Sequence, residues 1–515
     1  MEVIALGMPI ALAVWAAIVM NWRWGVYGIA LYTPLTGPVI AALYPSPLGA
    51  LARDLLIVIP LYLSFFLMHG ARGAERVPAY VVVAIGAFFI VVMASLTNPG
   101  VPNMMVGGIG AKVWLWYIPM IFVGAAMINT ERDLRNILRA IVITGWIPAG
   151  VGVIMFVGSF VWGYEPTMRF FYGKFANMFM GGFVYGGGEL YRIVGTFQYN
   201  SQYGIFCMYM FFPIMMLKEL ETDRRWKLFS KLSMLLMMVA AFTSGARGNI
   251  VYVPMVLILV QLFRFKASGA AGGIAVGAVG LFVLFQVSGI DPIYFASEML
   301  RLTATYGKAG LTDQLFDAVL CGGLFGMGAG TNTGAARHGM DLTALIEGNE
   351  KAWFIENFFG KAIIELGILG LFVLLFFDAM ILLHCLQVQT AIRTRRLRDA
   401  AACGTAMVAF IIICSFKGWA LDVDPINYYF FLTIGIVFGM PAMAARVDAA
   451  EAAARTQGVP QPAAEGPPGR RPMVTGMRLP PRGAMIPRGT ALPRIDYTGR
   501  AYRGGYGYGA SRDDR

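Results

Sequence analysis

The sequence has 515 residues, of which 58% are hydrophobic and only 14% are charged. Together with a mean hydropathy of +0.65, this composition excludes an ordinary soluble domain. The formal net charge is +12 at pH 7, and the basic residues gather between long apolar stretches. We therefore expect a polytopic membrane protein.

The apolar stretches predict an all-α fold with about 12–13 transmembrane helices, since a helix needs about 20 mostly apolar residues to cross a bilayer. Runs such as 54–68 (DLLIVIPLYLSFFLM) are apolar throughout and lack the alternation of barrel strands. The first stretch has no basic flank or cleavage site, which favours a retained helix over a signal peptide. The expected spans lie near 3–20, 24–44, 54–70, 78–97, 111–129, 136–161, 202–217, 228–243, 249–263, 270–288, 357–385, 403–416 and 426–443.

Basic loops predict which ends of these helices lie together. The segments ARGAER, TERDLRNILR, KELETDRRWK, RFK and RTRRLRD all fall on one side if every span is counted. By the positive-inside rule that side is cytoplasmic. The opposite, outer side then receives two large loops, near 163–202 and 288–357, which belong to a transmembrane domain of residues 1–445.

The C-terminal segment 446–515 is rich in Pro, Gly and Arg, as in RLPPRGAMIPRG and YRGGYGYGASRDDR. It has too little apolar surface to offset the entropy of ordering. We expect a disordered, basic cytoplasmic tail. Contacts with anionic lipids and an RNA-binding role are alternatives for its arginines, but we expect no nucleic-acid partner.

Metal and cofactor signals are weak. The five cysteines form no CxxC pair, and the three histidines are far apart, so neither a disulfide framework nor a metal site is indicated. The GMGAG stretch at 326–330 resembles part of a dinucleotide loop, but no strand precedes it. We expect no metal and no cofactor.

Two arginines are candidates for binding an anion on the outer side. Arg247 lies in the short turn TSGARGN, and Arg192 precedes the polar stretch Gln198 to Gln202. A guanidinium binds phosphate oxygens through two parallel hydrogen bonds, so two of them facing one aqueous cleft would form a diphosphate site. The alternative for Arg247 is a helix end anchored at head-group level.

The end of the second outer loop supplies a candidate base. Glu356 and Asn357 precede the apolar run 357–385, and Glu356 is either a general base or a helix cap or ion-pair partner. His338 lies earlier in the same loop and is either a second base or an ordinary surface residue. Lys361 and Glu365 are spaced i, i+4, which predicts a structural ion pair.

The order of these features resembles the O-antigen ligase and O-antigen polymerase superfamily of bacterial membrane glycosyltransferases. The matching motifs are RIVGTFQYNSQ at 192–202, TSGARGN at 243–249, GMGAG at 326–330, and a closing signature in which nine residues separate Asn357 from Gly367. The family's ligases carry histidine where this chain has Glu356. That departure is compatible with a polymerase or another glycan-transferring relative.

The resemblance implies a metal-independent, inverting transfer of a glycan from an undecaprenyl-diphosphate carrier to a hydroxyl of a glycan or lipid acceptor. The site would face the periplasm or cell exterior from the bacterial cytoplasmic membrane, among membrane lipids and beside other polysaccharide-assembly proteins. Arg192 and Arg247 would hold the diphosphate, and Glu356 or His338 would accept the proton. The supporting residues would be Asn357, Gln198 and Lys361.

Two other classes of function remain open. A transporter or flippase would line a substrate path with the intramembrane charges Lys361, Asp378, Lys417 and Asp424, but the two halves of the sequence show no repeat symmetry. A non-catalytic envelope-assembly protein is the third class. The sequence does not separate ligase from polymerase.

Overall fold

The computed structural model describes residues 2–43, 48–180, 184–185, 188–189, 191–246, 248–264, 297, 313–334, 355, 357–422 and 424–456. All of them belong to one unit, Met1–Gln457. Arg247, His338 and Glu356 lie outside the described residues, as do the span expected near 270–288 and the tail beyond residue 456.

The described chain is helical, apart from two short antiparallel strands, β1 (Val184–Tyr185) and β2 (Gly188–Glu189). The first half contains α1 (Glu2–Met20), α2 (Arg23–Tyr32), η1 (Thr33–Leu35), α3 (Thr36–Leu43), α4 (Leu48–Arg53), the π-helical η2 (Asp54–Val58), α5 (Ile59–Tyr62), the π-helical η3 (Leu63–Met68), η4 (Ala74–Arg76), α6 (Ala79–Ser95), α7 (Met104–Leu115), α8 (Met120–Met127) and α9 (Glu131–Val161). The second half contains α10 (Tyr164–Tyr172), η5 (Gly173–Phe175), α11 (Ala176–Phe179), α12 (Asn200–Leu220), α13 (Arg224–Thr243), α14 (Asn249–Phe263), α18 (Phe358–Ala391), α19 (Arg395–Cys414) and α20 (Ile426–Thr456).

Nine helical segments of the described chain are long and apolar enough to cross a membrane, so the predicted helical, multi-pass architecture is confirmed. They are Arg23–Leu43, Leu51–Met68, Met104–Met127, Glu131–Val161, Asn200–Leu220, Arg224–Thr243, Phe358–Ala391, Arg395–Cys414 and Ile426–Ala449. The shorter apolar helices are Pro9–Met20, Ala79–Ser95 and Val251–Phe263. Every predicted span except the one near 270–288 overlaps one of these segments.

Two boundaries differ from the sequence-based expectation. Helix α7 begins at Met104 rather than near residue 111, because the Asn103 side chain accepts a hydrogen bond from the Val106 N–H and caps the first turn. Helix α20 continues to Thr456, so the expected start of the tail at 446 falls inside a helix.

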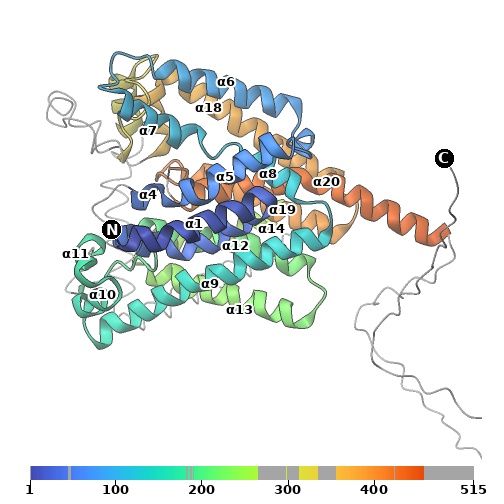
Figure 1. The fold of residues 1–515 in the computed structure, drawn as a ribbon, viewed down its shortest axis with the longest axis horizontal. Coiled ribbons are helices and arrows are strands. Elements are labelled where there is room, and N and C mark those ends of the chain that lie inside the picture. The colour runs from blue at the N-terminus through green and yellow to red at the C-terminus, as the bar shows by residue number, and fades with distance from the viewer. Residues whose placement is uncertain are drawn as a thin grey trace, which may run out of the picture. The chain divides into compact units, whose positions relative to one another are not determined.

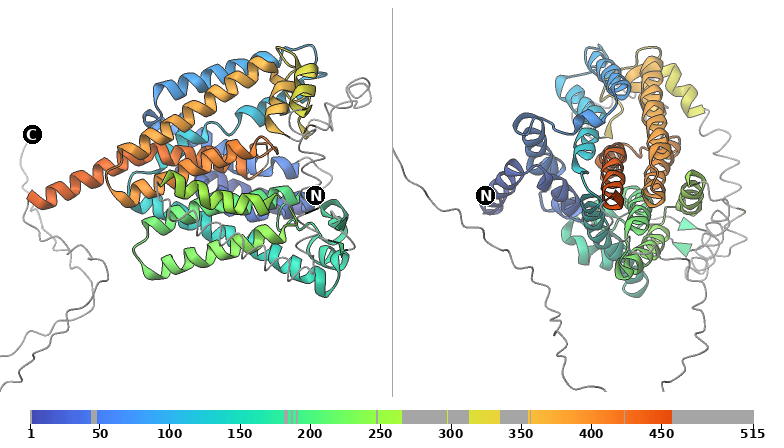
Figure 2. Two further views of the ribbon diagram at one scale, coloured as in Figure 1. Left: turned by 180° about the vertical axis from the view of Figure 1, so that it is seen from behind. Right: turned by 90° about the vertical axis from the view of Figure 1, so that its right-hand side faces the viewer.

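The basic loops meet at one end of the unit, which we call the basic end (Figures 1 and 2). Polar contacts join these loops to one another: Arg23 with Asp133, Arg139 with Glu221, Arg264 with Glu219 and Asp399, Arg396 with Glu131, and Arg446 with Asn129. The opposite end, the loop end, carries residues 97–103, the described part of 163–199, and residues 313–334. The grouping of loops expected from charge is therefore present in the structure.

Helix α18 is broken close to the loop end. Gly367 has φ 78° and ψ 179°, a backbone conformation that excludes it from the helix. The loop 322–330 inserts at this break: the Met327 and Gly328 N–H groups donate to the carbonyls of Ile364 and Glu365, and the Ile368 N–H donates to Gly323. Because hydrocarbon offers no hydrogen bonds, backbone groups freed within a span need such partners.

Candidate functional site

The segment that carries Arg192 lies against the turn TSGARGN. The Ile193 N–H donates to the Ser244 carbonyl at 3.2 Å. Gly245, with φ 70°, approaches so closely that an added Cβ would lie 2.7 Å from the Tyr191 carbonyl oxygen. Two of the motifs singled out in the sequence therefore meet at the loop end, although Arg247 itself is outside the described residues.

Side chains hold this non-helical segment in place. The Tyr164 ring stacks on Tyr191 with centroids 4.4 Å apart, and the Tyr164 hydroxyl donates to the Arg192 carbonyl at 3.0 Å. Tyr172 donates to the Gly195 carbonyl, and the Gly37 N–H donates to the Thr196 carbonyl at 2.8 Å. Each contact satisfies a carbonyl that no helix uses. These contacts fix the backbone at Arg192, and the Arg192 side chain is half-buried.

The polar stretch after Arg192 starts helix α12. The side-chain oxygen of Gln202 accepts hydrogen bonds from the backbone N–H groups of Gln198 and Tyr199, each at 3.0 Å. This satisfies donors that a helix start leaves without intrahelical partners. The structure therefore gives Gln202 the capping role and leaves Gln198 half-buried at the same place.

Asn357 is the N-cap of helix α18. Its side-chain oxygen accepts from the Gly360 N–H, and its amide donates to the Gln314 side chain at 3.1 Å. The next residue, Phe358, donates its N–H to the Ser415 carbonyl at 3.0 Å. Asn357 is 1% exposed. The capping role considered for Glu356 is therefore filled by its neighbour.

Lys361 and Glu365 do not form the expected i, i+4 pair, because each side chain is engaged by a different part of the chain. The Lys361 ammonium is fully buried, lies 2.5 Å from Asp422, and faces the rings of Trp114 and Trp419 at 5.2 and 5.7 Å. Helix α18 therefore presents its charges to two different neighbours, and the spacing rule for an isolated helix does not hold here.

The glycine-rich loop 326–334 wraps around the carboxylate of Glu365. That carboxylate accepts hydrogen bonds from the N–H groups of Gly330 and Asn332 and from the Thr333 hydroxyl, all at 2.9 Å, and from the Trp114 indole at 2.7 Å. The loop amides that a phosphate would need are thus already donated to the protein's own anion. This is the physical reason to reject a dinucleotide site at GMGAG.

A second buried ionic centre was missed in the sequence. Arg53 is 2% exposed and its guanidinium lies 2.8 Å from Asp424 and 3.2 Å from Asp54. Lys112 lies 2.6 Å from the second oxygen of Asp54, and the Tyr117 hydroxyl donates to Asp54 at 2.9 Å and contacts Arg53. The positive charges of Arg53 and Lys112 balance the negative charges of Asp54 and Asp424. Such a balance is needed because an unpaired charge buried in a membrane span is costly.

The signals for this centre were present but ambiguous. Arg53, Asp54 and Lys112 sit at or near the ends of apolar runs, where long charged side chains normally reach for water. The sequence indicates Asp424 only as a charge of a transporter path. A charge that lies inside a membrane span is a functional hypothesis by default, and applying that rule to Asp54 and Lys112 would have identified them.

The loop 415–424 connects the two ionic centres. It supplies Asp422 to Lys361 and Asp424 to Arg53, two residues apart. Helix α7 also touches both, because it carries Lys112 and Trp114. The other charges named for a transporter path differ: Lys417 is exposed, and within the described part of the chain neither carboxylate oxygen of buried Asp378 has a hydrogen-bond partner.

Comparison with protein-family models and with the sequences of curated proteins finds no match to this chain. Within the ranges that the structure describes, no three or more His, Cys, Asp or Glu side chains are grouped as metal ligands. The functional argument therefore depends on the geometry of the loop end.

Proposed function

We propose that this protein is a membrane glycosyltransferase that transfers or polymerises a glycan from an undecaprenyl-diphosphate carrier onto an acceptor hydroxyl. The observation that supports it best is the backbone contact between segments 191–193 and 244–245. These segments carry the two arginine motifs, RIVGTF and SGARG, and their contact brings the motifs together at the end opposite the basic loops. The outer face of a bacterial cytoplasmic membrane is the proposed location of that end.

In this proposal Arg192 and Arg247 hold the diphosphate of the donor. Their charge stabilises the negative charge that develops on the leaving group as the bond between the anomeric carbon and the phosphate oxygen breaks. The acceptor oxygen forms the new bond to the anomeric carbon from the opposite side, which inverts the configuration. Undecaprenyl diphosphate is the second product.

Glu356 or His338 accepts the proton that the acceptor hydroxyl loses. Glu356 is joined to the N-cap Asn357, whose own hydrogen bonds fix the start of α18. Lys361, one turn further, ties this helix to loop 415–424 through Asp422. Asn357 and Lys361 are thus proposed as positioning residues, and Gln198 as a residue that faces the same end.

Arginine substitutions in purified protein test the diphosphate site. Arg192→Ala and Arg247→Ala are each expected to lower glycan transfer from a lipid-diphosphate donor by about 10²-fold or more, because each removes a preorganised charge. Arg192→Lys keeps the charge without the bidentate geometry and should retain part of the activity. Arg169→Ala is the matched control, because Arg169 is an exposed arginine of the same outer loop and pairs with Glu165.

The base is tested by Glu356→Gln and His338→Gln under the same conditions. The substitution that removes the base should lower turnover while leaving donor binding intact. Wild-type transfer by both arginine-to-alanine variants, with normal amounts of protein in the membrane, would refute the proposed diphosphate site.

A transporter is the second candidate function, and Asp378 is the observation that favours it. This carboxyl group lies within helix α18 and is 4% exposed, and among the described residues neither of its oxygens has a hydrogen-bond partner. Lone acids at membrane depth often belong to ion or proton pathways. Asp378→Asn in reconstituted liposomes separates the two functions: lost flux with retained glycan transfer assigns Asp378 to transport.

A further inference from the structure

The turn 69–78 lies at the basic end, directly before helix α6. Its Arg76 side chain reaches the end of α8, where it donates to the carbonyls of Ala125 and Ile128 at 2.8 and 2.6 Å. It also donates to the side-chain oxygen of Asn129 at 2.7 Å. All of these acceptors are neutral. The contacts therefore fix the position of the Arg76 guanidinium without neutralising its charge.

Helix α20 brings a second guanidinium to the same place. Arg446 donates to the Asn129 carbonyl at 3.3 Å and to the Asn129 side-chain oxygen at 3.5 Å. Because Arg76 donates to that same side-chain oxygen, the two guanidinium groups lie side by side. The Arg446 side chain is exposed, so the pair is open to a ligand from outside the protein.

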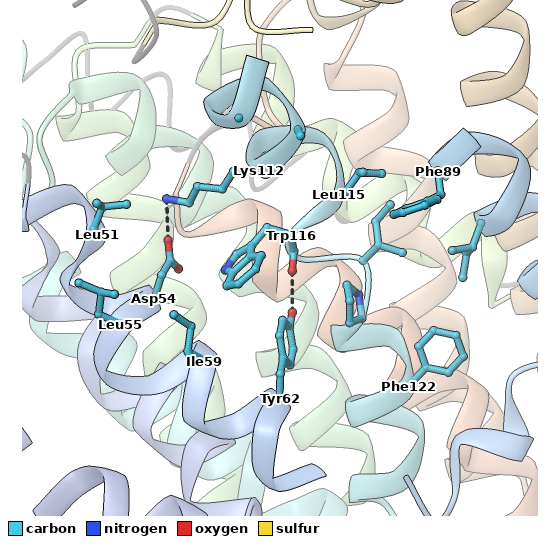
Figure 3. A pocket seen from close by; sticks show the side chains of 15 residues that line it. Leu51, Asp54, Leu55, Ile59, Tyr62, Phe89, Lys112, Leu115, Trp116 and Phe122 are labelled. Atoms are coloured by element: carbon cyan, nitrogen blue, oxygen red, sulfur yellow. Dashed lines mark hydrogen bonds and ion pairs between the residues drawn. The ribbon is translucent and has the colours of Figure 1, made fainter. Parts of the chain in front are cut away.

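This pair differs from the cations of the two buried ionic centres. There a carboxylate lies against each cation, as Asp54 does at 2.6 Å from Lys112 (Figure 3). Within the described part of the chain, neither Arg76 nor Arg446 has a carboxylate within 4.0 Å. The acids of the neighbouring segments are engaged with other groups: Glu75 with a backbone N–H of its own turn, Glu131 with Arg135, Asp133 with Arg23, and Asp448 with Thr394.

The excess positive charge acts on the Arg76 guanidinium itself. Burial is the largest cause that lowers the pKa of this group, and the charge of Arg446 lowers it further. Glu75 opposes these effects, and Arg23 adds a smaller decrease of the pKa. An arginine nevertheless stays protonated in a protein. An anion that contacts both guanidinium groups would therefore relieve their mutual repulsion.

A pocket of about 470 Å³ opens on the same turn. Its lining combines a cation with apolar side chains: Trp22, Leu67, Met68, His69, Gly70 and Arg72. Leu67 and Met68 end a membrane span and are 76% and 60% exposed. Arg72 is exposed as well, and no described residue forms an ion pair with it. The turn thus presents cations beside hydrocarbon at the level where a span ends.

We propose that turn 69–78 and Arg446 form a binding site for the head group of an anionic phospholipid, which we call the basic-turn site. The phosphodiester oxygens contact Arg76 and Arg446, and Arg72 is the third cation. The acyl chains follow the exposed side chains of Leu67 and Met68. This site lies at the end opposite the arginine motifs, and the inference does not depend on the proposed function.

Two properties of the basic-turn site select this ligand. Guanidinium groups bind phosphate oxygens through paired hydrogen bonds, and anionic lipids are attracted to basic side chains next to a membrane span. The exposed apolar side chains fit acyl chains, which a soluble phosphate lacks. A zwitterionic phospholipid is disfavoured, because its ammonium group would face the same three arginines.

Removal of two charges tests the site. The double variant Arg72→Gln, Arg446→Gln changes exposed side chains and leaves Arg76 packed on α8. Binding of phosphatidylglycerol to purified full-length protein is measured by native mass spectrometry from a neutral detergent. We expect binding to weaken at least about tenfold, since each arginine near a membrane surface contributes a factor of about five.

The double variant Arg224→Gln, Arg225→Gln is the matched control. It removes the same charge from two exposed arginines of another basic loop, at the start of α13. We expect it to bind phosphatidylglycerol as wild type does. Equal weakening in both double variants would overturn the proposal, because it would show a general attraction to a basic surface rather than a site.

Two other ligands separate the intact lipid from its parts. Phosphatidylcholine should bind at least about tenfold more weakly than phosphatidylglycerol, because its ammonium is repelled. Glycerol 3-phosphate has the phosphate without the chains and should not displace phosphatidylglycerol at equal concentration. Equal binding of phosphatidylcholine would refute the anionic site, and displacement by glycerol 3-phosphate would refute a lipid ligand.

A single variant keeps the test possible if the double variant does not accumulate. Arg72→Glu reverses a charge on a side chain for which the described chain provides no ion-pair partner, so it leaves the fold contacts intact. It should weaken phosphatidylglycerol binding at least as much as Arg72→Gln. Wild-type binding by Arg72→Glu would contradict the role of this cation and overturn the site.

Discussion

Removal of the carboxylate beside Lys361 is the sharpest test of the buried ionic structure. The Lys361 ammonium is fully buried, its carboxylate partner Asp422 is 2.5 Å away, and two tryptophan rings face it. Asp422→Asn keeps the shape of the side chain but removes the compensating charge. The helix start that carries Asn357 then holds an ammonium without an anion.

The expected cost follows from the environment. Breaking a buried ion pair by removing one partner typically costs about 3–5 kcal/mol. The two rings offset part of it, because a desolvated cation over an aromatic face gains about 1–2 kcal/mol. We therefore expect Asp422→Asn to lower the free energy of unfolding by about 1–4 kcal/mol.

The double variant Lys361→Met, Asp422→Leu separates charge from packing. It removes both charges, and we expect its stability to lie within about 1 kcal/mol of wild type. The measurement is unfolding by SDS in mixed micelles, followed for the cycle of wild type, Lys361→Met, Asp422→Leu and the double variant, and separately for Asp422→Asn. The control pair is Arg169 with Glu165, 64% and 57% exposed, where loss of either partner should cost at most about 1 kcal/mol.

The reasoning is refuted if Asp422→Asn is no more destabilising than Glu165→Gln. It is also refuted if the double variant is the least stable member of the cycle. Either outcome would mean that the loss of Asp422 does not leave the Lys361 ammonium without compensation in the folded protein.

Three further predictions follow from the same contacts. Gly330→Ala should destabilise the protein by about 2 kcal/mol or more, since φ is 92° and the new Cβ would lie 2.1 Å from the Val106 carbonyl oxygen. Gly334→Ala is the control in thermal unfolding, because a Cβ there would meet no atom of the described chain within 4 Å. Trp114→Phe should cost about 1.5–3 kcal/mol in the same assay, because the Glu365 carboxylate loses its indole donor; no change would show that the carboxylate is satisfied without it. If the loop end faces outward, as proposed, membrane-impermeant maleimide should label Cys321 in intact cells and leave the four buried cysteines unmodified. Because burial and the nearby Asp317 raise the pKa of this thiol, labelling should quicken as the pH rises from 7 to 9. A Cys321→Ser variant that is still labelled would contradict the assignment.

The sequence is sufficient to predict the helices because a membrane span is a continuous apolar run of residues. Segments such as 136–161 and 426–443 are recognisable without knowing their neighbours, and positive loops show which ends lie together. The sequence does not predict the α18 break at Gly367, since the run 357–385 is apolar on both sides of it. Its cause lies in loop 322–330, whose backbone contacts replace those of the helix.

The ionic centres were beyond the sequence for a different reason. Lys361 meets an acid 61 residues away, and Glu365 meets an indole 251 residues away. The local rule predicted a Lys361–Glu365 pair because it considers only one helix. The distant residue that pairs with each charge depends on how the helix ends are arranged in space. A single sequence does not contain that information.

These long-range contacts explain why costly buried charges are kept near the candidate site. Arg53 with Asp424 and Lys361 with Asp422 both fasten loop 415–424, and Glu365 fastens the glycine-rich loop. All three join elements that the helical core alone would leave loosely placed at the loop end. Loss of activity on substituting any of these residues is therefore expected from misplacement alone, without chemistry. Only residues outside this framework, Arg192 and Arg247 above all, can test the proposed diphosphate site, and only when the unfolding free energy of each variant equals that of wild type.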